Sequence, residues 1–148
     1  MSSPYNSIET EIENVIATWL QGCIDIGACS FTDYGCLKTG LDEESLEENR
    51  IVISVVSAAE LFAQSGIWNT EVRLIVYTNM DSTNALTNHR SNVGILRDTV
   101  MESNLVNSLN SSTSEVLFSG VGTYRADNQI EERSAVGGLT FNLIASGA

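Results

Sequence analysis

The sequence is poor in positively charged residues. Seven lysines and arginines stand against nineteen acidic residues in a chain of 148, which gives a net charge of -12. Proteins that bind nucleic acids gain affinity by replacing counterions with lysine and arginine. The shortage of these residues therefore predicts that the chain does not grip DNA or RNA.

Long apolar runs are also missing. No stretch approaches the roughly 20 apolar residues that cross a bilayer, so we expect no contact with a membrane. The first seven residues show no basic region followed by an apolar block, which predicts that there is no secretory signal. The length suits one domain with a real core. We therefore expect a single soluble domain over residues 1–148.

Residue types that carry catalysis or bind metals are scarce. His89 is the only histidine and has no HExxH partner, and no GxxxxGK[ST] phosphate loop occurs. The acidic run from Asp42 to Glu48 lacks the spacing of a calcium-binding loop. We expect no catalytic residue, no metal and no cofactor, and we interpret His89 as structural. A small α/β enzyme or ligand-binding domain that pairs His89 with a cysteine stays open as an alternative.

The three cysteines lie in one short stretch, at Cys23, Cys29 and Cys36. Their number is odd and no CxxC spacing occurs, which disfavours a disulfide framework and a zinc site. They are predicted to be reduced thiols that pack as small hydrophobic side chains.

Apolar periodicity predicts two helices and about four strands. Residues 8–20 carry apolar side chains at steps of three and four, which indicates a helix that ends near Gly22, and a second helix is predicted over 80–103. The strands are predicted at 51–56, 68–78, 115–124 and 139–144. The fold class expected is α+β, with a mixed or antiparallel sheet of about four strands packed against two helices.

Residues 22–49 form the least regular part of the sequence and predict a long N-terminal loop or hairpin. Phe31 and Tyr34 lie in this segment, where no periodic element is expected to bury them. We expect them on a surface that becomes ordered on assembly. Ordinary packing over an open sheet edge is the alternative.

Two further sets of charged residues are candidates for contacts between subunits. Arginine outnumbers lysine six to one, and its planar guanidinium suits carboxylates at interfaces, which points to Arg50 and Arg73. Glu131, Glu132 and Arg133 precede the terminal strand and could form reciprocal ion pairs in a ring. The alternative for this cluster is an exposed turn whose ion pairs contribute under about 1 kcal/mol each.

The order of elements resembles the tail terminator family of tailed bacteriophages, and also the tail-to-head joining proteins. The resemblance rests on an acidic amphipathic helix (IETEIENVIATWL), a strand introduced by an arginine (ENRIVISVVSAAE) and a tryptophan-led strand that runs into a helix (GIWNTEVRLIVYTNMDSTNALTNHRSNVGILRDTV). A short turn (NLVNSLN) and a charged turn before the last strand (EERSAVGGLTFNLIA) complete it. It covers the chain from Ile8 onward as a pattern of elements.

This resemblance implies a virion structural protein without catalysis. Terminators form a ring, usually a hexamer, that caps the tail tube, ends its polymerisation and joins it to the head connector. The implied partners are other copies of the chain, the tail tube protein and the head-tail connector, and assembly would occur in the host cytoplasm. The genome would pass an acidic channel without being bound. A different neck role, in head completion or tail-to-head joining, fits the same pattern.

Overall fold

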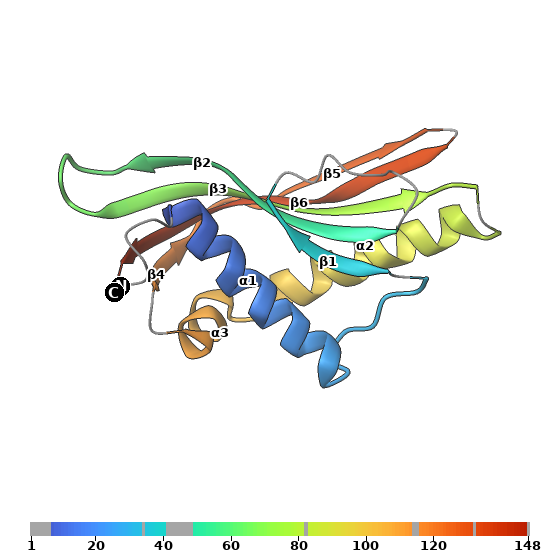
Figure 1. The fold of residues 1–148 in the computed structure, drawn as a ribbon, viewed down its shortest axis with the longest axis horizontal. Coiled ribbons are helices and arrows are strands. Elements are labelled where there is room, and N and C mark those ends of the chain that lie inside the picture. The colour runs from blue at the N-terminus through green and yellow to red at the C-terminus, as the bar shows by residue number, and fades with distance from the viewer. Residues whose placement is uncertain are drawn as a thin grey trace.

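The computed structural model describes residues 7–33, 35–40, 49–81, 83–113, 116–131 and 133–147. Within these residues the chain forms three helices and six strands (Figure 1). In chain order they are α1 (Ile8–Asp25), β1 (Cys36–Thr39), β2 (Arg50–Glu60), β3 (Ile67–Asn79), α2 (Ala85–Glu102), α3 (Leu105–Ser112), β4 (Val116–Val121), β5 (Arg125–Ile130) and β6 (Ser134–Gly147).

The six strands belong to one mixed sheet with the order β1-β2-β3-β6-β4, and β5 also pairs with β6. β1 runs parallel to β2, and every other pairing is antiparallel. The sheet is therefore larger than the sequence predicted, because β1, β5 and the helix α3 were not expected. The prediction of about four strands and two helices is wrong.

Each of the unexpected elements has a physical reason for its weak signal. β1 is only four residues long and lies in the segment predicted to be an irregular loop. All six residues of β5, Arg125 to Ile130, are exposed, so the strand shows no alternation of apolar and polar residues. α3 is rich in serine and asparagine, which favour turns over helices, and it occupies part of a predicted linker.

All three helices lie on one face of the sheet (Figure 1). Val72, Leu74 and Val76 of β3 are at most 2% exposed and belong to the core between the two layers, as the period of two predicted. On the other face of β3, Arg73 is exposed and Ile75 and Tyr77 are half-buried. Only one side of β3 is therefore covered by helices, although the sequence suggested cover on both sides.

β6 is the strand that connects the two halves of the sheet. It pairs with β3 over its length, from Asn79 opposite Ser134 to Ile67 opposite Ser146. Its other edge is divided, since β5 occupies residues 135–140 and β4 occupies residues 143–147. The predicted terminal strand at 139–144 is confirmed and extends in both directions.

α1 packs its apolar stripe, which includes Ile12, Ile16 and Leu20, into the core with no exposure. Ser7 caps the helix, because its hydroxyl accepts a hydrogen bond from the Thr10 N–H at 3.2 Å. The helix continues past Gly22 to Asp25, beyond its predicted end. No helix in the described part of the chain is long and apolar enough to cross a membrane.

Glu13 of α1 completes the edge of β2. β1 pairs with β2 only over residues 50–53, and at Val55 the free N–H donates to the Glu13 carboxylate at 2.9 Å. Glu13 is 8% exposed. Burial raises the pKa of its carboxyl group; the Val55 N–H opposes this in part, and the charge of Glu9 adds to it.

We expect Glu13 to make the folded state less stable as the pH rises. Because the folded chain holds the Glu13 proton more tightly than the unfolded chain does, the free energy of unfolding falls between the ordinary carboxyl pKa and the raised one. Glu13→Gln keeps an oxygen for the Val55 N–H but cannot ionise. Denaturant unfolding between about pH 4 and pH 7 should therefore show a smaller loss of stability in this variant than in the parent chain.

Glu13→Ala is the control, since it removes the acceptor as well as the charge. It should lower the free energy of unfolding by about 1–3 kcal/mol, because the buried Val55 N–H loses its partner. Parallel pH profiles for the parent chain and Glu13→Gln would contradict the assignment.

Candidate functional site

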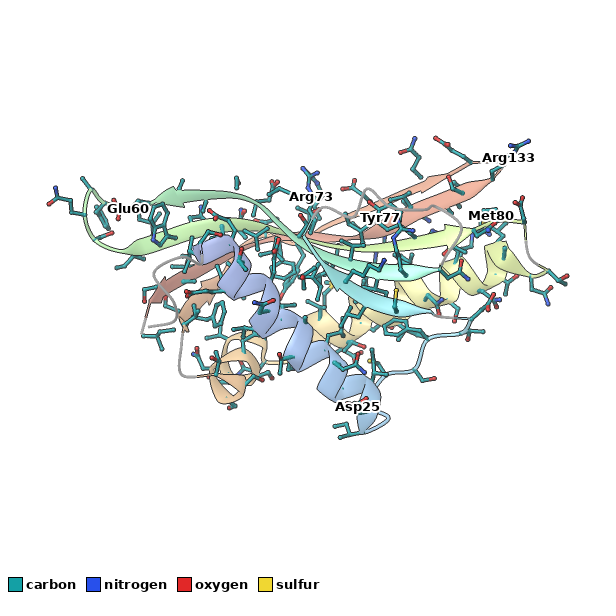
Figure 2. The ribbon with its side chains drawn as sticks, in the orientation of Figure 1. Asp25, Glu60, Arg73, Tyr77, Met80 and Arg133 are labelled. Carbon is teal, nitrogen blue, oxygen red and sulfur yellow. The ribbon has the colours of Figure 1, made fainter. Side chains whose placement is uncertain are left out.

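The β2–β3 hairpin extends beyond the helices at one end of the sheet, where Figure 2 labels Glu60. We call residues 56–67 the hairpin tip. It exposes four large apolar side chains: Val56 at 39%, Leu61 at 43%, Phe62 at 71% and Ile67 at 36%. Clusters of this kind are costly in water and mark candidate interaction sites.

The hairpin tip is held in a defined shape by its own hydrogen bonds. The Leu61 N–H donates to the Ile67 carbonyl at 2.9 Å, and the Ser65 N–H donates to the Phe62 carbonyl at 3.0 Å. The two carboxylate oxygens of Glu60 accept from the Gln64 N–H at 2.8 Å and the Gly66 N–H at 3.0 Å. Gly66 supplies the positive φ of 71° that the turn requires.

The hairpin tip is also nearly free of charge. Glu60 is the only ionisable residue between Ser54 and Thr70, and both of its carboxylate oxygens are bonded to the backbone. In a chain of net charge -12, this segment is one where a second acidic molecule can approach with little repulsion.

The opposite end of the sheet is the β5–β6 hairpin, where Arg133 lies in the turn (Figure 2). Glu131 and Arg133 are both exposed, and Glu132 lies outside the described residues. The Glu131 N–H donates to the Ser134 carbonyl at 2.9 Å, and the Arg133 carbonyl accepts from the Met80 N–H at 3.0 Å. The charged cluster therefore sits on a turn that is fixed to the end of β3.

Side chains of α2 fasten β5 to the rest of the molecule. His89 is fully buried and bridges two strands, with its Nδ1 2.8 Å from the Thr78 hydroxyl and its Nε2 2.9 Å from Asn128 Oδ1. Arg97 donates to the carbonyls of Gly138 at 2.9 Å and Asp127 at 2.7 Å. Both hydrogen-bonding nitrogens of His89 are thus used to join α2, β3 and β5.

The two arginines predicted at interfaces have different surroundings. Arg73 is exposed on the face of the sheet opposite the helices (Figure 2), and its guanidinium lies 3.3 Å from the Glu71 carboxylate. Arg50 is only 2% exposed, and its guanidinium carbon lies 4.4 Å from the centre of the Tyr77 ring. Arg73 is therefore accessible to a partner, whereas Arg50 is buried within its own chain.

The aromatic residues predicted in the N-terminal loop are only partly described. Phe31 is half-buried against the core, and the neighbouring Thr32 backbone exchanges two hydrogen bonds of 2.8 Å with the Asn92 side chain. Tyr34 lies outside the described residues. Phe31 thus packs on its own chain, which is the alternative that the sequence left open.

A shallow groove of about 570 Å³ lies along α1 and β1. It is lined by Ala17, Thr18, Gln21, Gly22, Asp25 and Leu37. The one charged residue in this lining, Asp25, accepts a hydrogen bond from the Gln21 amide at 2.9 Å. The groove therefore offers a weakly charged concave surface made largely of small side chains.

The thiols and acidic groups were also examined as possible reactive centres. Cys29 is buried, and burial raises the pKa of the Cys23 and Cys29 thiols, which disfavours the reactive thiolate. No cluster of three or more histidine, cysteine or acidic residues that could hold a metal ion occurs among the described residues.

No protein-family model matches the sequence, and no curated protein matches it either. The candidate site is therefore defined by geometry: the hairpin tip, the charged β5–β6 end and the groove along α1. The sequence pointed to the charged end and missed the other two. The signal that could have revealed the hairpin tip was Leu61-Phe62, an apolar pair without charged neighbours apart from Glu60.

Proposed function

We propose that this protein is a virion structural component of the tail terminator type, which forms a ring with copies of itself on the end of the tail tube. The observation that carries the proposal is that the sheet ends in two different surfaces. One end is the uncharged, apolar hairpin tip, and the other is the polar β5–β6 hairpin with Glu131 and Arg133. Subunits that contact one another head to tail need two unlike surfaces.

The charge of the chain supports the same role. Each copy carries -12, so a ring of six copies would carry six times that charge. An acidic lining would repel the phosphates of a passing genome and let it slide. A ring structure with a basic channel would argue against this part of the proposal.

The use of the buried polar groups also supports a structural role. Glu13 accepts a backbone N–H, and His89 is bonded to side chains of β3 and β5. These groups stabilise the fold through contacts that leave them no free position for a substrate. On this proposal the chain has no catalytic centre and acts through the surfaces that it presents.

Binding to purified tail tubes and to head-tail connectors is the test. A terminator should bind the tube end and stop further addition of tube protein, and light scattering should show a ring in the bound or free state. Binding to the connector alone would favour another neck role. A chain that stays monomeric beside both partners would overturn the proposal.

A further inference from the structure

The exposed apolar side chains of this protein are concentrated at the hairpin tip. Among the described residues, nine large apolar side chains are exposed, and four of them are Val56, Leu61, Phe62 and Ile67. The other five are dispersed over α1, α2, β4, β5 and the residue after α1. A surface of this kind is stabilised when a partner covers it.

The hairpin tip is already ordered in the single chain. Its turn is closed by backbone hydrogen bonds and by both oxygens of Glu60. A preformed surface loses little conformational entropy on binding, so its apolar contacts contribute more fully to affinity. Phe62, at 71% exposure, is the side chain with most surface to bury.

Charge indicates what kind of partner this surface fits. Two copies at net charge -12 repel each other over most of their surfaces. The hairpin tip and the groove along α1 each carry a single acidic residue, Glu60 and Asp25, and each carboxylate already accepts hydrogen bonds from its own chain. Contact between these two regions brings acidic copies together where repulsion is weakest.

The groove has the shape to receive an apolar side chain. Its volume of about 570 Å³ is within the range of sites that enclose small organic groups, and an added Cβ at Gly22 would meet no atom within 4 Å. Ile26, which is 81% exposed, follows the end of α1 and extends the apolar rim. Because Glu60 and Asp25 lie at separate extremities of the molecule (Figure 2), a chain does not fill its own groove with its own hairpin tip.

We propose that the hairpin tip of one copy docks into the groove along α1 and β1 of a second copy, with Phe62 as the central contact. This inference rests on the ring of the proposed function and specifies which surfaces close it. The contact is head-to-tail, so each copy uses its hairpin tip on one side and its groove on the other.

Phe62→Asp and Thr18→Trp test the two sides of the contact separately. Phe62→Asp places a charge in the apolar contact, and Thr18→Trp fills the groove from an exposed position of α1. Each variant alone should self-associate at least about 30-fold more weakly in sedimentation velocity. Mixed together, they should form heterodimers, because the Thr18→Trp tip and the Phe62→Asp groove are both intact.

Leu117→Asp is the matched control, because Leu117 is 53% exposed on β4, outside both surfaces. It should assemble like the parent chain. A photo-crosslinker placed at position 62 should react with residues 17–25 or Leu37 of another copy, as read by mass spectrometry. Rings that persist in Phe62→Asp, or crosslinks to other segments, would overturn this inference and leave the proposed ring intact. A parent chain that never self-associates would overturn both.

Discussion

Gly138→Ala is expected to lower the free energy of unfolding by about 3 kcal/mol or more. A Cβ at Gly138 would lie 1.9 Å from the Leu74 carbonyl oxygen and 2.9 Å from its carbon. These atoms belong to the backbone of β3, so no side-chain rotation can relieve the overlap. The strand itself would have to move.

Movement of β6 at Gly138 would disturb three elements at once. The residue lies opposite Ile75 of β3 and Asp127 of β5, and its carbonyl accepts from Arg97 of α2 at 2.9 Å. Gly120→Ala is the control, because its Cβ would meet only Ile144 Cδ1 at 3.6 Å, an ordinary contact. Denaturant unfolding of both variants measures the difference, and equal effects would show that the close approach to Leu74 is not the cause.

Arg50→Ala is expected to cost about 3–5 kcal/mol of stability. Arg50 is among the largest fully buried side chains, and its guanidinium lies over the Tyr77 ring. The substitution leaves a cavity and removes the cation–π contact, which contributes about 2 kcal/mol where the ring and the cation are shielded from water. The effect should appear in thermal unfolding of the isolated chain, before any assembly.

Arg73→Ala is the matched control on the same face of the sheet. Its side chain is 45% exposed and its partner Glu71 is 32% exposed, so its ion pair is screened by solvent. The loss should be under about 1 kcal/mol. Arg50→Met should give an intermediate value, since it keeps the volume of the stem and lacks the cation. If Arg50→Ala left stability unchanged and altered only assembly, Arg50 would be an interface residue after all.

The elements with a clear period were predictable from the sequence. β3 alternates Val72, Leu74 and Val76 with polar or half-buried neighbours, and α1 repeats apolar residues every three or four positions. Their burial is written into local spacing. For the same reason the long strands were placed nearly at their observed bounds.

The elements that were missed depend on partners distant in sequence. β5 has no apolar face, and it is held by the backbone ladder to β6 and by His89 and Arg97 of α2. α3 is secured by Leu105 and Leu109 in the core, and by Asn110, whose side chain bonds both the N–H and the carbonyl of Phe118. No window of residues contains these contacts, so local spacing could not reveal them.

The candidate site was predictable only where charge marked it. The cluster of Glu131, Glu132 and Arg133 was visible as a charged turn, whereas the burial of Arg50 depends on Tyr77 in the neighbouring strand. The hairpin tip appeared as an ordinary turn, because exposure depends on where the helices end over the sheet. The groove along α1 needs β1, which was not predicted.

The position of β6 between β3 on one edge and β4 and β5 on the other has a consequence during synthesis. β3 emerges from the ribosome well before β6, by a delay on the order of several seconds at about 5–20 residues per second. Throughout that delay one edge of β3 is open, next to the apolar hairpin that precedes it. A nascent chain of this kind gains from a chaperone that shields β3 until its second neighbour arrives.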